Sequence, residues 1–241
     1  MHHKPTPGKL RLGELVKKIG TSATSLKRRL RTAREKIRII VQEQRRIARS
    51  KGLYAVALTL TYRDGGQFAQ KNVTGFVSSL RRKLTRMGHT LPYVWSLERA
   101  NALHYHLMVW IPRGFRLTHK ELEKWWPWGS TWIEACRHVR AWTRYISKSE
   151  DKQNLPPGAR LFGSGGLDAA GKAQVLRATL PYWLRVLGSC GSTITRWHRK
   201  WVDIETGEIF KSPWKWTPKG FRLETDHTSS SAICLLISTS D

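Results

Sequence analysis

The stretch L-E-R-A-N-A-L-H-Y-H-L-M-V-W, residues 97–110, places two histidines inside an apolar run. On a β-strand, residues two positions apart point to the same face of the sheet. His104 and His106 are therefore expected to project side by side, where two imidazoles can share one divalent cation. The simpler interpretation is that both are ordinary sheet histidines that bind no ion.

A carboxylate near the histidines favours the metal interpretation. Glu98 precedes the connection R-A-N-A, residues 99–102, which is short enough to join two antiparallel strands in a hairpin. Glu98 would then lie across from His104 and supply an oxygen ligand. Two histidines and one carboxylate with open positions suit Mg²⁺, Mn²⁺ or another first-row ion held against a phosphate.

A second group of reactive side chains follows in A-W-T-R-Y-I-S-K-S-E, residues 141–150. Tyr145 and Lys148 are three residues apart on a predicted helix, so both lie on one face. A phenol is a competent covalent nucleophile when a metal or a nearby cation favours its ionised form. Lys148 could provide that charge or bind the phosphate, although the pattern Y-x-x-K alone is common by chance.

The order of these segments resembles the HUH endonuclease superfamily over residues 53–167. V-A-L-T-L-T-Y (56–62) resembles its first motif. The segment 93–110 resembles its second motif, in which both histidines and the preceding glutamate bind metal. T-R-Y-I-S-K (143–148) resembles the third, which carries the nucleophilic tyrosine and its lysine, and 158–167 resembles a segment that often follows.

In detail the chain looks like the rolling-circle replication initiators of plasmids and filamentous bacteriophages. The two-tyrosine members carry a second tyrosine four residues after the first, whereas here Ser149 follows Tyr145 at that spacing. The resemblance therefore implies a single-tyrosine enzyme, and it leaves open how the strand transfer is completed.

The resemblance implies a metal-dependent DNA endonuclease and strand transferase. Tyr145 and Lys148 would be catalytic, and Glu98, His104 and His106 would hold Mg²⁺ or Mn²⁺. The enzyme would nick one strand of single-stranded DNA or an origin hairpin, form a 5′-phosphotyrosine and a free 3′-OH, and later rejoin strands. A host polymerase and helicase would be its partners in the cytoplasm of a bacterial host cell.

Two alternatives remain open at this stage. A single-tyrosine transposase or a relaxase would use the same chemistry for other biology. A basic nucleic-acid-binding protein without catalysis is a different class, and it leaves the order of the histidine pair, the glutamate and the tyrosine as coincidence.

The composition points to an anionic partner. The chain of 241 residues has 43 lysines and arginines against 17 acidic residues, a formal net charge of +26. Charge of this size repels itself in a compact state, and DNA or RNA is the natural counterpart. No apolar run approaches the ~20 residues of a membrane span, and the first residues lack the apolar segment of a secretory signal. Cys136, Cys190 and Cys234 show no C-x-x-C spacing, which disfavours a zinc cage or a disulfide framework and fits a reducing cytosol.

Hydrophobic periodicity predicts the elements that must position these residues. Their order, β-α-β-β-α-β followed by a helix, predicts an α+β fold. We expect a ferredoxin-like split β-α-β antiparallel sheet with helices on one face, plus an N-terminal basic helix and a C-terminal extension. The expected strands are 53–62, 91–99, 103–111 and 131–139, and the expected helices are 25–50, 72–87, a short one from Thr118, and 141–152.

Three regions are expected along the chain. Residues 1–50 form a basic lead-in, mobile over 1–20, and a helix; residues 51–167 form the nicking domain; residues 168–241 form a C-terminal helix, a hairpin and a flexible tail. The Gly/Pro-rich stretch 155–167 is expected to be a loop.

Basic side chains and one tryptophan are the candidate DNA contacts. We expect a steep fall of affinity with salt, since lysines and arginines would contact phosphates. Trp128, between Pro127 and Gly129, is the preferred candidate for stacking on a flipped-out base, against the alternative that it packs on the sheet. The basic candidates are Arg28, Arg29, Arg81, Arg82, Arg144 and Arg160.

Overall fold

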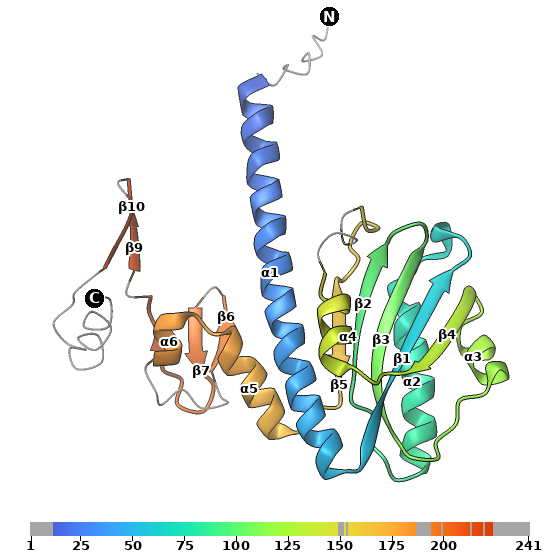
Figure 1. Ribbon diagram of the computed structural model, residues 1–241. Helices are drawn as coiled ribbons and strands as arrows, with labels where there is room; N and C mark the ends of the chain where they lie inside the picture. Colours follow the sequence, from blue (N-terminus) through green and yellow to red (C-terminus); the bar gives the residue numbers. More distant parts are fainter. Residues whose placement is uncertain are drawn as a thin grey trace, which may run out of the picture.

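The computed structural model describes residues 12–148, 152, 154–186, 194–198, 200–212, 214–218 and 220–223, with side chains of the first helix from residue 29 onward. A five-stranded antiparallel sheet forms its centre, in the order β4-β1-β3-β2-β5 (Figure 1). The strand that carries both histidines, β3, is the middle one. The strands are β1 (Leu53–Tyr62), β2 (Tyr93–Arg99), β3 (Leu103–Pro112), β4 (Gly129–Ala135) and β5 (Phe162–Gly165).

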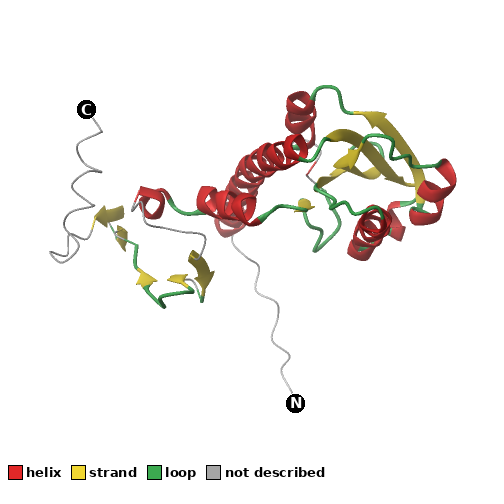
Figure 2. Ribbon diagram, turned by 90° about the horizontal axis from the view of Figure 1, so that it is seen from below, coloured by secondary structure: helices red, strands yellow, loops and turns green. Residues whose placement is uncertain are grey.

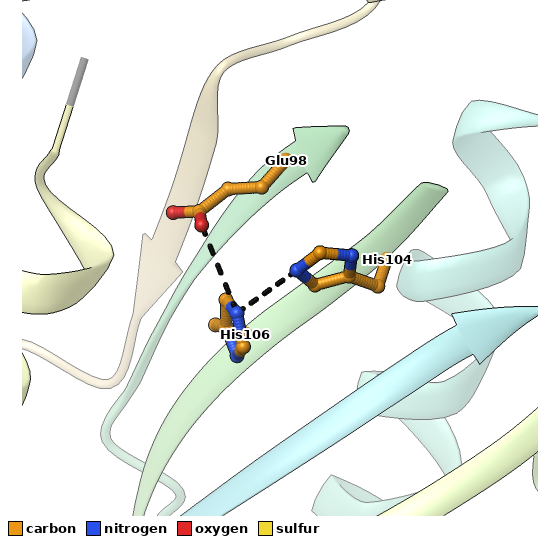
Figure 3. Close-up of side chains that lie close together, drawn as sticks. All are labelled: Glu98, His104 and His106. Carbon is orange, nitrogen blue, oxygen red and sulfur yellow. Dashed lines mark hydrogen bonds and ion pairs between the residues drawn. The ribbon is translucent and has the colours of Figure 1, made fainter. Parts of the chain in front are cut away.

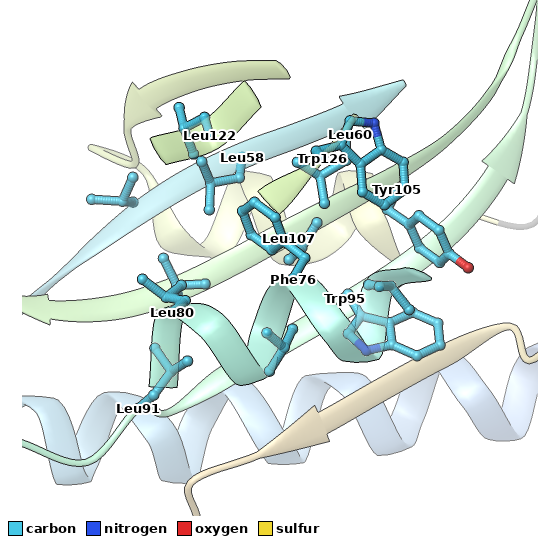
Figure 4. Close-up of a cluster of buried hydrophobic side chains, with 14 of the residues drawn as sticks. Leu58, Leu60, Phe76, Leu80, Leu91, Trp95, Tyr105, Leu107, Leu122 and Trp126 are labelled. Atoms are coloured by element: carbon cyan, nitrogen blue, oxygen red, sulfur yellow. The ribbon is translucent and has the colours of Figure 1, made fainter. Parts of the chain in front are cut away.

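Apolar side chains cover both faces of the sheet because β1 and β3 carry them at alternate and intervening positions. On one face, Leu60 and Tyr105 belong to a buried cluster with Phe76 and Leu80 of α2 (Gln70–Arg86) (Figure 4). Two further elements follow the strands: the short 3₁₀ turn η1 (Gly65–Gln67) and α3 (His119–Trp125). Thr118 and Glu121 form a capping box at the start of α3, as its sequence indicates.

The histidine face is covered by two other helices, α1 (Leu12–Ser50) and α4 (Val139–Ile146). Ile37, Ile40 and Val41 of α1 are buried with Met108 of β3. The buried side chain of Gln44 fastens α1 to the sheet, because its Nε2 donates to the carbonyls of residues 93 and 165, on two neighbouring strands. Figure 1 shows the N-terminal half of α1 running on past the edge of the sheet.

The α+β class with an antiparallel sheet is confirmed. The expectation of helices on one face holds for α2 and α3, whereas α1 and α4 pack on the other face, so helices flank the sheet on two sides (Figure 2). The second layer forms because the histidine face also carries small and apolar residues that need cover. The first helix begins at Leu12, so the lead-in expected over 1–20 is wrong from residue 12 on, and residues 1–11 lie outside the described residues.

The stretch 155–167 contains the fifth strand, which the sequence did not predict. A Cβ atom at Gly163 would lie 2.5 Å from the ring of Trp95, and one at Gly165 would lie 2.5 Å from the ring of Tyr93. These glycines let β5 approach β2 beneath the aromatic rings. Their presence made the segment look like a loop, because glycine is rare in strands.

Beyond the sheet, α5 (Ala169–Thr179) lies beside α1, on the side away from the strands, and α6 (Tyr182–Val186) follows (Figures 1 and 2). Instead of the single hairpin expected over 194–210, three strands pair as β6-β7-β8. The strands are β6 (Ile194–Trp197), β7 (Lys200–Asp203) and β8 (Ile209–Phe210), with a hairpin of β9 (Trp214–Thr217) and β10 (Gly220–Leu223) after them. The tail expected from Asp226 lies outside the described residues. Within them, no helix is both long and apolar enough to span a membrane.

Candidate metal and tyrosine site

The two histidines and the glutamate meet on the exposed end of the histidine face. The hairpin register pairs Glu98 of β2 directly with His104 of β3, which confirms the position expected from the short connection. One ligand atom from each of Glu98, His104 and His106 lies within 4.8 Å of the others, and Figure 3 shows the three side chains converging. Glu98 and His106 are buried, and His104 is partly exposed.

Hydrogen bonds orient both imidazoles. The Nδ1 of His104 lies 2.9 Å from the carbonyl of Ala102, so Nδ1 carries the proton and Nε2 presents its lone pair to the site. The two Nε2 atoms are 3.0 Å apart, and the Nδ1 of His106 lies 3.1 Å from the hydroxyl of Thr59 on β1. Because a hydroxyl can donate or accept, Thr59 can hold His106 in the tautomer that turns Nε2 into a ligand.

The carboxylate of Glu98 has two differently placed oxygens. Oε1 accepts hydrogen bonds from the Nζ of Lys152 at 2.7 Å and from the hydroxyl of Ser96 at 3.1 Å. Oε2 lies 3.7 Å from the Nε2 of His106. Lys152 is itself buried, and it also donates to the carbonyl of Ile146 at 3.0 Å. One oxygen is thus fixed by protein donors, and the other faces the histidines.

The site keeps His106 neutral. Burial, followed by the neighbouring His104 and Lys152, lowers the pKa of His106 to about 3. An imidazole must be unprotonated to bind a metal, so no proton has to leave His106 at neutral pH.

A divalent cation fits this arrangement. Two nitrogen ligands about 2.1 Å from a metal and at right angles to each other lie about 3.0 Å apart. The two Nε2 atoms have that separation. Two imidazoles and one carboxylate suit a first-row transition ion or magnesium. The residues therefore form a possible metal site, and the identity of the metal stays a prediction.

The tertiary structure brings Tyr145 to the histidines. The ring centroid of Tyr145 lies 4.9 Å from that of His106, and Trp142 packs against both rings at 5.5 and 5.6 Å. Tyr145 is 41% exposed, so one side of the ring faces solvent. The helix α4 ends at Ile146 and not near Lys152 as expected, because the chain turns there and sends Lys152 back to Glu98.

Lys148 lies just after α4 and still neighbours the tyrosine. Its Nζ is 4.8 Å from the centroid of the Tyr145 ring, and its backbone N–H donates to the carbonyl of Tyr145 at 3.1 Å. The ammonium therefore lies over the face of the aromatic ring, a cation–π contact.

The predicted DNA contacts fall in different places. Arg144 is exposed beside Tyr145, whereas Arg81 and Arg82 lie on α2, on the far face of the sheet from the histidines. Arg29 is exposed on α1, Arg160 is exposed shortly before β5, and the side chain of Arg28 lies outside the described residues.

Trp128 does not lie near the histidines. Its ring packs at 5.2 Å from that of buried Trp126, in the cluster on the α2 face. A different tryptophan of the same segment, Trp132 on β4, pairs in register with Thr59, so it points to the histidine face. Trp132 is 66% exposed, which leaves an open aromatic surface close to the site.

Sequence reasoning missed the residues that support the ligands. Thr59 belongs to the recognised T-L-T-Y segment, and its strand parity could have placed it on the histidine face. Lys152 follows Lys148 by four residues, but nothing in that spacing pointed to Glu98. The other missed residues are Ser96, Trp142 and Trp132.

Comparison with known proteins agrees with this geometry. Residues 55–150 match the family model of the Replication-associated protein ORF2. The match covers less than half of the chain, but it includes β1, the histidine strand and Tyr145. No curated protein and no solved structure shows significant similarity to the chain. The matched segment supports a role in DNA replication of the rolling-circle type.

Proposed function

We propose that the protein initiates rolling-circle DNA replication by nicking one strand through Tyr145 and later rejoining strands. The observation that carries this proposal is the approach of Tyr145 to His106, at 4.9 Å between ring centroids, next to a cluster that can hold a cation. Phosphodiester cleavage needs a nucleophile and a positive charge at one phosphate, and the two lie side by side here.

The chain's own residues have distinct parts in this reaction. Glu98, His104 and His106 would hold Mg²⁺ or Mn²⁺, and the ion would supply positive charge to the scissile phosphate. The oxygen of Tyr145 forms a bond to phosphorus, and the bond from phosphorus to the 3′ oxygen breaks. Lys148, above the tyrosine ring, favours the ionised phenol and neutralises charge that develops on the phosphate.

The products explain the biological use. The 5′-phosphotyrosine retains the phosphodiester bond energy, and the released 3′-OH is a primer for a host polymerase, with a host helicase opening the duplex. A later 3′-OH attacks the phosphotyrosine and seals the strand. The site of action would be the cytoplasm of a bacterial host cell.

A covalent adduct tests the proposal directly. Single-stranded oligonucleotides that tile the DNA around the protein's own gene are labelled at the 3′ end and incubated with the protein and Mn²⁺. We expect a labelled protein band on a denaturing gel from the wild type and from Tyr54→Phe, a control on a partly exposed tyrosine of β1. Tyr145→Phe should give no band, and His106→Ala should lose the metal-dependent band while it still binds DNA.

The outcomes separate the candidate functions. A band from Tyr145→Phe would refute the assignment of the nucleophile. DNA binding without an adduct under any metal would favour the non-catalytic nucleic-acid-binding protein. A transposase would excise a segment with two defined ends from a circular substrate, whereas an initiator would leave a circle nicked at one origin.

A further inference from the structure

A hollow of about 1830 Å³ lies between α1 and α4, beside the tyrosine. One wall is the C-terminal half of α1, which precedes residue 55, where the family match begins. The other wall is α4. The hollow is therefore built partly by an element that the matched family segment does not contain.

Both walls are basic. On α1, Arg34, Arg38, Arg45 and Arg49 recur at spacings of four, seven and four residues, which keeps them on one side of the helix. On α4 and just beyond it, the basic residues are again four apart: Arg140, Arg144 and Lys148. Two rows of cations thus border the same space.

Acidic side chains neutralise little of this charge. Glu35 pairs with Arg38 at 2.7 Å, and Arg46 is paired with Glu43 and Asp168. Within the described residues, no carboxylate lies at ion-pair distance from the remaining arginines of the hollow: Arg34, Arg45, Arg49, Arg140 and Arg144. Uncompensated like charges at close quarters oppose the compact state, and a polyanion between them removes that cost.

The hollow leads to the proposed nucleophile. Tyr145 and Lys148 belong to its lining, and the ring of Tyr145 contacts His106 on its other side. A second hollow of about 480 Å³ shares Arg45, Arg49 and Arg140 with the first and adds Arg137 at the start of α4. The basic lining is therefore continuous from Tyr145 to the N-terminal end of α4.

We infer that this channel between α1 and α4 holds the sugar–phosphate backbone of the single-stranded DNA that reaches Tyr145. The inference rests on the proposed function for the role of Tyr145. A single strand is favoured because its phosphates can follow a hollow between two helices up to one side chain, and facing rows of arginine contact phosphates on both sides. The first helix is then part of the DNA-binding site.

Equal changes of charge on two surfaces test the inference. The channel variant Arg45→Gln, Arg49→Gln, Arg140→Gln is compared with a control that removes three exposed charges on the α2 and α3 side: Arg86→Gln, Arg113→Gln, Lys120→Gln. Both are made in Tyr145→Phe and measured without metal, so no cleavage occurs. Binding of a labelled single-stranded oligonucleotide is followed by fluorescence anisotropy from 50 to 300 mM salt.

The channel variant should lose phosphate contacts, and the control should not. Each contact to a single strand contributes about 0.7 to the slope of log K against log salt, so three lost contacts lower the slope by about 2. At 0.15 M salt the same loss weakens binding about 50-fold. The control should weaken binding less than threefold, and neither variant should have a lower melting temperature than the parent, because the replaced side chains lie at the surface.

The results distinguish this inference from the proposed function. Equal weakening by both variants would overturn the channel, since only the total charge would matter. Tighter binding of duplex DNA or of RNA of the same length would overturn single-stranded DNA as the occupant. If the wild type forms the covalent adduct but the channel variant binds as tightly as the control, the channel fails while the nicking reaction stands.

Discussion

Lys152 carries the positive charge that compensates the buried carboxylate of Glu98. The side chains of Lys152 and Glu98 are 3% and 2% exposed, and their Nζ and Oε1 atoms are 2.7 Å apart. Lys152→Met keeps an unbranched chain of similar length but removes the charge and both hydrogen bonds. Removing one partner of a buried ion pair typically costs about 3–5 kcal/mol, because the other charge stays buried and unpaired.

We therefore expect Lys152→Met to lower the free energy of unfolding by about 3–5 kcal/mol in metal-free buffer. Urea unfolding followed by tryptophan fluorescence, with EDTA present, measures this change. Lys148→Met is the matched control, since Lys148 is exposed and should change stability by less than about 0.5 kcal/mol. Glu98→Gln in the Lys152→Met background should recover part of the loss, about 0.5–3 kcal/mol of coupling.

Metal should restore the variant more than it stabilises the wild type. In the wild type, Lys152 and a divalent cation share one carboxylate, whereas in Lys152→Met the cation alone neutralises Glu98. Repeating the unfolding series with Mn²⁺ should therefore give a larger stabilisation in the variant. If Lys152→Met unfolds at the same urea concentration as the wild type without metal, the ion pair does not compensate Glu98 and the reasoning fails.

Three further substitutions probe the surroundings of the site. Thr59→Val removes the partner of His106 Nδ1 and should weaken Mn²⁺ binding about 10–100-fold by calorimetry; unchanged affinity would show that Thr59 does not orient the ligand. Trp132→Ala should weaken single-stranded DNA binding by about 1–3 kcal/mol, whereas equal loss in Trp197→Ala, a similarly exposed control, would contradict stacking at β4. Gly166→Ala should cost about 2 kcal/mol or more in thermal unfolding, because φ is +74° and the added Cβ would lie 2.2 Å from a backbone carbonyl oxygen; a stability equal to the wild type would contradict this.

Local features of the chain were sufficient to predict the ligand cluster. Alternation of side chains along a strand placed His104 and His106 on one face, and the length of the connection placed Glu98 opposite His104. Both are short-range consequences of backbone geometry, so they need no knowledge of distant contacts. The capping box at Thr118 was predictable for the same reason.

The partners of these residues depend on contacts between distant segments. Lys152 reaches Glu98 across 54 positions, and Thr59 reaches His106 across 47. β5 was missed because glycines Gly163 and Gly165 look like a loop until the aromatic rings above them are known.

The same limit applies to the DNA-contacting surfaces. The composition predicted an anionic partner, but it could not say that Arg45 of α1 would lie across a hollow from Arg140 of α4. Nor could it say that Trp132 would be exposed on the histidine face while Trp128 packs on the other. Backbone periodicity decides which side chains share a face, whereas the packing of one layer on another decides what each face meets.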